Sequence, residues 1–297
     1  MLESRSRRRV VLDTDTYNEV DDQFALAHLL LSSEEIEIEA VYAAPFFNNR
    51  SSSPADGMEK SYDEIARVIE LVGGSQPPIF RGSTSYLPGP HVAVESAAAT
   101  DLIERAMALR DGERLYVAGI AAATNLASAL LLQPGIADRI TLVWLGGHAP
   151  QWVDTREFNL QQDLNAARVL LDSLVPLILI PCCPVASHLI VTVPELEKHL
   201  APHSKLGAYL TDIVRNYGDN SPGWSKVIWD ISASAWLVNP ELISTQREPS
   251  PLLQDNLTWG ERTGRRQIQI AHGMNRDAIF ADFFKKAALA GKSLPSR

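Results

Sequence analysis

The segment VVLDTDTYNEVDDQFALAHLL, residues 10–30, joins an apolar run to a helical pattern through a group of acidic side chains. Residues 10–13 are typical of a buried strand, and residues 22–33 are typical of a helix. Between and at the edges of these elements lie the carboxylates of Asp13, Asp15, Glu19, Asp21 and Asp22. Either the group is a solvated turn that favours a helix N-terminus, or a cation offsets the repulsion between its charges.

Strand and helix patterns alternate along most of the chain. Further strands are predicted at 36–44, 115–119, 140–147 and 174–180, and further helices at 57–73, 124–133 and 164–173. This alternation predicts right-handed βαβ units and a mainly parallel sheet. Beyond residue 187 the sequence is rich in helix, at 193–217 and 227–238, and it closes with a strand at 266–271 and a helix at 276–289.

The fold class predicted from these patterns is α/β, with a mainly parallel, twisted, Rossmann-like sheet flanked by helices. We expect one domain over residues 10–290, preceded by a disordered basic tail over residues 1–9. The polar stretch at 46–57 is predicted to be a long loop beside a strand end, where function tends to reside.

Composition excludes several classes of partner. The chain has 297 residues, is 45% hydrophobic and 21% charged, and carries a net charge of −9, which argues against nucleic acid or an anionic membrane as a partner. No apolar stretch is long enough to span a bilayer. Cys182 and Cys183 are adjacent, so they cannot form an ordinary disulfide with each other, and they are interpreted as small buried residues at a strand end. These features favour a cytoplasmic setting.

Two interpretations of the acidic group come from known motifs. An EF-hand calcium loop is excluded, because its sixth position would be Asn18 instead of glycine and its twelfth Phe24 instead of glutamate. The run VVLDTDT also resembles the DxDxT motif of haloacid-dehalogenase-type phosphatases, with Asp13 as nucleophile and Asp15 as acid. That family's later acidic pair is incomplete here, because residue 223 is glycine, and Asp21 and Asp22 would have no task.

A third interpretation uses every carboxylate. Ligands bind at the carboxyl ends of parallel strands, and Asp15 together with Asp21 and Asp22 can direct several oxygens at one hard cation. DTDTYNEVDDQFAL resembles the DTDxGxDDxxAL signature of the inosine–uridine type of nucleoside hydrolase, with two extra residues in the turn. Other blocks resemble that family in the same order over roughly residues 9 to 287: TNLASAL (124–130), WLGG (144–147), REFNLQQDLNAARVLL (156–171), VIWDISA (227–233) and NRDAIFADF (275–283).

The resemblance implies a hydrolase that cleaves the N-glycosidic bond of ribonucleosides with the help of Ca²⁺. It implies as calcium ligands Asp15, Asp22, the backbone carbonyl of Thr124, and Asp230. Asp15 would accept a proton from the attacking water, and Asp13 would support the cluster from behind. Ribose hydroxyls would be bound by Asp21, Asn48 (or Asn49), Glu157 and Asn159.

The position before Asp230 carries the implied specificity. Many family members have a histidine there that protonates the leaving base, whereas this chain has Trp229, whose indole N–H has no useful pKa for acid catalysis. Trp229 could instead stack on the base, which predicts a purine preference. A catalytically silent nucleoside- or ribose-binding protein of the same fold stays an alternative. The resemblance further implies a homodimer or homotetramer.

Overall fold

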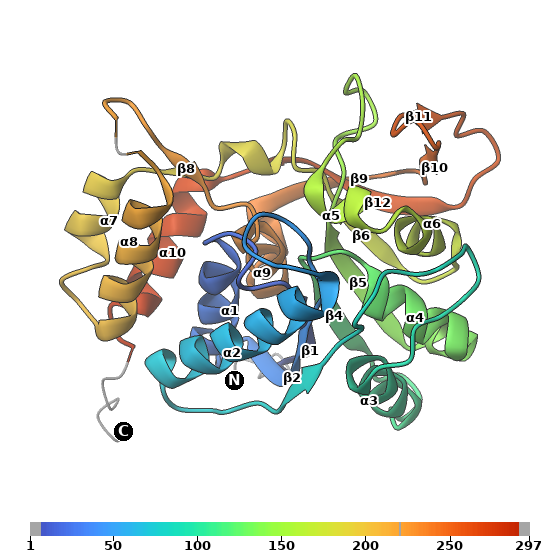
Figure 1. Ribbon diagram of the computed structural model, residues 1–297, viewed down its shortest axis with the longest axis horizontal. Helices are drawn as coiled ribbons and strands as arrows, with labels where there is room; N and C mark the ends of the chain where they lie inside the picture. The colour runs from blue at the N-terminus through green and yellow to red at the C-terminus, as the bar shows by residue number, and fades with distance from the viewer. Residues whose placement is uncertain (1–6, 220, 291–297) are drawn as a thin grey trace, which may run out of the picture.

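The computed structural model describes residues 7–219 and 221–290, and a central eight-stranded sheet organises them (Figure 1). The strand order is β3-β2-β1-β4-β5-β6-β12-β9, and every neighbouring pair is parallel except β12 and β9. The strands are β1 (Arg8–Thr14), β2 (Ile36–Ala43), β3 (Ile79–Arg81), β4 (Leu115–Gly119), β5 (Ile140–Leu145), β6 (Leu177–Ile180), β9 (Ile243–Pro249) and β12 (Gln267–Met274). The predicted α/β class is confirmed.

The order of the first six strands places the acidic segment. In a doubly wound sheet of order 3-2-1-4-5-6, the chain turns in opposite directions on either side of the first strand, and a crevice opens beyond the carboxyl ends there. Asp13 pairs in register with Gly119 across β1 and β4. The segment after β1 and the segment after β4, which leads into Thr124, therefore lie at the edge of the same crevice.

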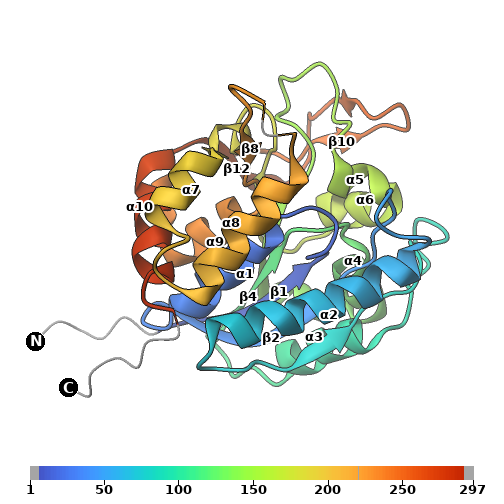
Figure 2. The ribbon, with the colours of Figure 1, turned by 60° about the vertical axis from the view of Figure 1, so that its left-hand side comes forward.

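Two helical layers cover the two faces of the sheet (Figures 1 and 2). Side chains alternate between the faces along each strand, so Val10 and Leu12 join one apolar core while Val11 joins the other. The first core is shared with α1 (Asp22–Leu31), α2 (Pro54–Val72), α7 (Val193–His199), α8 (Lys205–Tyr217), α9 (Ile231–Val238) and α10 (Arg276–Ala287). The second is shared with α3 (Ala97–Met107), α4 (Thr124–Leu132), α5 (Phe158–Gln162) and α6 (Leu164–Asp172).

Short elements complete the fold. Two antiparallel pairs lie outside the main sheet, β7 (Ile190–Val191) with β8 (Lys226–Val227) and β10 (Leu252–Leu253) with β11 (Trp259–Gly260). Single turns of 3-10 helix occur at Pro134–Asp138, Ala186–His188 and Pro240–Leu242. Within the described ranges, no helix is both long and apolar enough to cross a membrane.

Several element boundaries differ from those predicted. The first strand begins at Arg8, because the guanidinium of Arg9 pairs with Glu39 and Glu113 and holds this part of the expected tail in the sheet; residues 1–6 lie outside the described chain. Helix α2 begins at Pro54 within the predicted loop, since Ser53 caps it by accepting a hydrogen bond from the backbone N–H of Asp56.

The helix predicted over 227–238 is shorter than expected. Residues Lys226–Val227 form strand β8, and helix α9 begins only at Ile231. Trp229 and Asp230 therefore lie at the entrance of a helix instead of within one. Asp230 therefore occupies the N-cap position of α9.

Candidate active site

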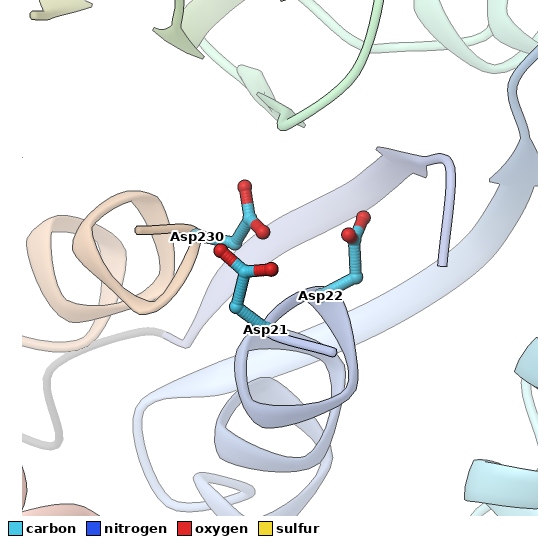
Figure 3. A group of neighbouring side chains, drawn as sticks. All are labelled: Asp21, Asp22 and Asp230. Carbon is cyan, nitrogen blue, oxygen red and sulfur yellow. The ribbon is translucent and has the colours of Figure 1, made fainter. Parts of the chain in front are cut away.

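Three carboxylates from two helix N-termini meet at the crevice. Asp21 and Asp22 open helix α1, and Asp230 directly precedes helix α9, which packs against α1. Ligand oxygens of Asp21, Asp22 and Asp230 all lie within 4.8 Å of one another, and all three residues are buried (Figure 3). The positive ends of the two helix dipoles stabilise negative charge here, but they offset only part of the repulsion between three carboxylates.

The end of strand β1 adds two more buried acids. Asp15 is 1% exposed, and neither of its carboxylate oxygens has a hydrogen-bond partner among the described residues. In Asp13, Oδ1 accepts a hydrogen bond of 2.7 Å from Nδ2 of Asn125, while Oδ2 has no partner in that part of the chain. A buried carboxylate without a partner is costly, so the arrangement fits a cation whose coordination would use the free oxygens.

The pKa values of the buried carboxyl groups in this region are raised. Burial raises the pKa of Asp13 to about 7 against a weaker opposing effect of the Asn125 hydrogen bond. Burial and the neighbouring charge of Asp21 raise the pKa of Asp22 to about 7, although the hydroxyl of Thr14 donates to this carboxylate. Burial and adjacent carboxylates raise the pKa values of Asp15 and Asp230 well above the usual range. Burial and mutual repulsion thus make Asp13, Asp15, Asp22 and Asp230 hold protons more tightly than exposed carboxyl groups do, with pKa values above their usual range.

Two of the predicted ligands, Asp22 and Asp230, lie in the close group together with Asp21. Asp15 lies near this group, since the charges of Asp22 and Asp21 act on its carboxylate. Thr124 is buried at the first position of α4, and its hydroxyl donates a hydrogen bond of 2.8 Å to Oδ2 of Asp163. The Asp163 carboxylate thereby fixes Thr124 at the start of that helix.

A cavity of about 270 Å³ opens beside the cluster. Its lining combines polar and apolar side chains from the ends of several strands, which suits a ligand with hydroxyl groups and one apolar face. The lining residues are Asn18, Glu19, Asp21, Ile120, Leu145, His148, Arg156, Glu157, Phe158, Asn159, Cys182, Cys183, Trp229 and Asp230. The cavity thus brings together five residues predicted for the site: Asp21, Glu157, Asn159, Trp229 and Asp230.

Glu157 is held by the backbone around it. Its carboxylate accepts hydrogen bonds from the N–H groups of Gly147 (2.7 Å), Asn159 (2.9 Å) and Leu160 (3.0 Å). Burial raises its pKa, and these backbone hydrogen bonds oppose the rise. Gly147 follows strand β5 with a φ of +67°, and a Cβ there would lie 2.6 Å from Oγ1 of Thr155, so the close approach to Glu157 requires glycine.

Asn48 is the predicted site residue that the structure places elsewhere. It lines a second, larger cavity of about 890 Å³ and does not line the smaller one. Its Nδ2 donates to the side-chain oxygen of Asn18 at 2.7 Å, and its Oδ1 accepts from the N–H of Arg50. The Nδ2 group of Asn48 is thus bound to the turn after β1, and its Oδ1 is bound within its own loop.

The structure also adds residues that the sequence patterns did not single out. His148 lines the smaller cavity, and its Nδ1 accepts a hydrogen bond from the N–H of Cys183, which leaves the proton of the neutral ring on Nε2. His148 directly follows the WLGG block, which was its only signal in the sequence. Cys182 and Cys183 are free, as predicted, and both also line this cavity.

Lys226 is the least expected of these neighbours. Its ammonium group pairs with Glu19 and lies 3.6 Å from Oδ1 of Asp21. Nothing in the sequence around residue 226 indicates a buried cation. Only the fold brings it to a segment that lies about two hundred residues away in the chain.

The fold and the site define a class of protein: an α/β protein with a buried group of carboxylates beside a partly polar cavity at the carboxyl ends of its strands. A profile of the inosine-uridine preferring nucleoside hydrolase family matches residues 10–281. The chain belongs to this family, and it is therefore an N-glycosyl hydrolase of the nucleoside hydrolase type. The family match replaces the phosphatase hypothesis, and Asp13 fits that outcome because it does not line either cavity at this site.

Individual relatives are distant. The chain is 24% identical to the pyrimidine-specific ribonucleoside hydrolase RihA of Salmonella enteritidis over 266 residues, which covers 80% of this chain and 81% of the relative. It is 26% identical to the protein of the same name from Salmonella agona over 267 residues, with the same shares.

Solved structures share the fold over almost the whole chain. A plant nucleoside hydrolase matches with a TM-score of 0.77 and 16% identity, over 95% of this chain and 99% of that one. A purine-preferring ribonucleoside hydrolase from Gardnerella vaginalis matches with a TM-score of 0.73 and 22% identity, over 95% and 98%. At these identities the likeness concerns the fold.

Proposed function

We propose that the protein hydrolyses the N-glycosidic bond of ribonucleosides, that the ribose binds in the smaller cavity, and that Ca²⁺ binds in the acidic cluster. The observation that carries this proposal is the buried Asp15 carboxylate with two unpartnered oxygens, adjacent to a close group of three further carboxylates. Such a donor set consists of oxygen ligands only, which is the set that Ca²⁺ prefers in proteins.

Asp15, Asp22, Asp230 and the backbone carbonyl of Thr124 would hold the ion. When bound, it would lower the pKa of a water molecule in the site. The chain's own contribution is then to place and deprotonate that water: an oxygen of Asp15 accepts its proton. Asp13 supports this arrangement, because its Oδ1 is fixed by Asn125 and its charge lies behind Asp15.

The ribose is held by groups that accept or donate in fixed directions. Asp21 and Glu157 line the cavity as carboxylates, and Asn159 is oriented by a hydrogen bond of 3.1 Å from its Nδ2 to the carbonyl of Leu145. Buried partners of this kind discriminate strongly against a substrate that lacks a hydroxyl. We assign Asn48 to the turn after β1 instead of the ribose, because its side chain binds Asn18.

Trp229 is the residue we propose for the base. It is half-buried on the cavity wall together with Ile120, Leu145 and Phe158, so its ring can stack on a departing heterocycle. The larger stacking surface of a purine favours purine nucleosides. Among the related proteins, one type is named for pyrimidines and another for purines, so the substrate panel below has to decide between the two.

The experiment is a release assay on the purified protein with inosine, adenosine, guanosine, uridine and cytidine, with added Ca²⁺ or with chelator. The expected result is free ribose from at least one nucleoside with Ca²⁺, strong loss with chelator, a higher kcat/KM for purines, and a loss of about 10²-fold or more in Asp15→Asn. No release from any nucleoside with Ca²⁺ present refutes the proposed function. Faster pyrimidine cleavage refutes the role of Trp229 alone.

We further propose a homo-oligomer. Light scattering on the eluted protein measures its mass, and a mass of 32.6 kDa, that of a single chain, would refute this.

A further inference from the structure

One lysine contacts the acidic cluster. Lys226 is 6% exposed, and its Nζ pairs with Glu19, lies 3.6 Å from Oδ1 of Asp21 and donates a hydrogen bond of 2.9 Å to the carbonyl of Val227. Its ammonium group also lies 5.2 Å from the centre of the Tyr217 ring. Across residues 7–219 and 221–290, no other basic side chain forms an ion pair with the carboxylates of this cluster.

Lys226 joins two segments that both reach the cavity. Asp21 has its Oδ1 next to Lys226, while its Oδ2 accepts a hydrogen bond of 3.1 Å from the backbone N–H of Trp229. The segment that contains Lys226 and Trp229 thus contacts both carboxylate oxygens of Asp21. Asp21 contributes the same carboxylate to the close acidic group (Figure 3).

The turn after β1, which contains the two extra residues Asn18 and Glu19, is also held by an ion pair and hydrogen bonds. Glu19 pairs with Lys226 through its side chain, and its backbone carbonyl accepts a hydrogen bond of 2.7 Å from Nη1 of Arg50. Asn18 is bound by Asn48 at 2.7 Å. Both Asn18 and Glu19 line the smaller cavity and the larger cavity, so this turn is the wall between them.

We propose that Lys226 is a positioning residue for nucleoside hydrolysis: its ammonium group locks the inserted turn and the Asp21 carboxylate to the segment that presents Trp229. This inference rests on the proposed function. It extends that function by assigning the two extra residues of the turn a task, which is to supply Glu19 as the partner that holds Lys226 in place.

The charges explain why a lysine can be buried here. An ammonium group removed from water is costly unless acids surround it, and Glu19 and Asp21 supply two negative charges within direct reach. The same positive charge opposes the binding of another cation nearby. Because a positive charge weakens the binding of calcium, we infer that Lys226 acts by orienting Asp21 and the turn after β1.

Lys226→Met is therefore expected to have two effects of opposite sign, on calcium affinity and on activity. Loss of the positive charge is expected to tighten Ca²⁺ binding by about tenfold, measured by calorimetric titration with calcium chloride alone. Loss of the grip on Asp21 is expected to lower kcat/KM for the best nucleoside by about 10- to 100-fold, since small misplacements of substrate-binding groups are costly. A lysine that merely supports the fold would lower calcium affinity and activity together.

Companion variants sharpen the test. Lys226→Arg keeps the charge and is expected to recover a substantial part of the activity. Glu19→Gln is expected to lower kcat/KM less than Lys226→Met does, and the double variant to lose little more than Lys226→Met alone, because both changes break one pair. Lys198→Met, on the exposed face of α7, is the matched control and is expected to behave as the wild type.

The proposal is overturned if Lys226→Met hydrolyses nucleosides at the wild-type rate, if calcium binding weakens together with activity, or if the effects of Glu19→Gln and Lys226→Met simply add. If Lys226→Met does not fold, the measurements on Glu19→Gln and Lys226→Arg decide: the first must lose activity while binding Ca²⁺, and the second must retain activity. Absence of hydrolysis in the wild type would refute the proposed function, while the calcium titration would still test the opposing charge.

Discussion

Asp22→Asn is expected to stabilise the calcium-free protein and to abolish its response to calcium. The oxygens of Asp21, Asp22 and Asp230 lie within 4.8 Å of one another. At an effective dielectric constant of about 20, two unit charges at this separation repel each other by about 3 kcal/mol. Removing one ionised carboxylate from the group should therefore raise the free energy of unfolding by about that amount at pH 8 in the presence of chelator.

Calcium should reverse the order of the two proteins. A ligand at about one thousand times its Kd stabilises the folded state by about 4.1 kcal/mol, which exceeds the roughly 3 kcal/mol gained by the variant and for a chain of this size raises Tm by about 8 to 16 °C. The wild type should show this rise and Asp22→Asn should not, while hydrolysis falls by at least 10²-fold in the variant.

The measurement is thermal unfolding followed by circular dichroism at pH 8, with chelator and with calcium chloride, for the wild type, Asp22→Asn and a control. Asp63→Asn, on the exposed side of α2, removes a negative charge far from the cluster and should change neither curve by more than about 0.5 kcal/mol. The reasoning fails if calcium-free Asp22→Asn is less stable than the wild type, or if calcium raises the Tm of both proteins equally.

Three further changes test other parts of the structure. Hydrogen bonds from His28 and Lys286 outweigh the effect of burial and lower the pKa of Asp282 to about 2. The ionised Asp282 carboxylate therefore stabilises the folded protein above pH 4, and this stabilisation is lost as the pH falls toward 2. In urea titrations, Asp282→Asn should therefore lower the free energy of unfolding by about 1 kcal/mol at pH 7, after allowance for solvent screening, and leave it unchanged at pH 2. An equal loss of stability at both pH values would contradict this. Gly147→Ala places a Cβ 2.6 Å from Oγ1 of Thr155 at a φ of +67°. This variant should lower the free energy of unfolding by about 2 kcal/mol or more in the same titrations and raise KM. An unchanged unfolding midpoint would disprove the strain. Trp229→Ala should lower kcat/KM about tenfold for inosine and less for uridine, and equal losses would remove the stacking role.

Patterns along the chain predicted six of the eight strands of the main sheet and most of the helices. The apolar runs at β1, β5 and β6 are continuous because these strands are buried on both faces, so they could be recognised without knowing their neighbours. Helix α3 was missed although Ser96 caps it, and the antiparallel strand β9 was missed because its residues are half exposed and show no clear alternation. The start of α9 was misplaced because the apolar residues before Asp230 continue the helical composition.

The candidate site was predicted unevenly for a similar reason. Asp15, Asp22, Glu157 and Asn159 stand in motifs with local spacing, so their approximate roles could be inferred from the resemblance. The contact between Asn48 and Asn18 has no local signal, because it depends on the path of the turn after β1. His148 and Lys226 have no motif, and only their positions beside the cavity and the acidic cluster make them candidates.

The sequence by itself determined the α/β class, the family and the acidic residues of the candidate site, because strands, helices and motif spacings are properties of short segments. Tertiary structure decided which carboxylates meet, since Asp230 reaches Asp21 and Asp22 only through the packing of α9 on α1. It also decided that Asp21 lies in the close group and that Lys226 lies against it. These contacts join residues about two hundred positions apart, and such separations are fixed by the order of strands in the sheet, which no local pattern encodes.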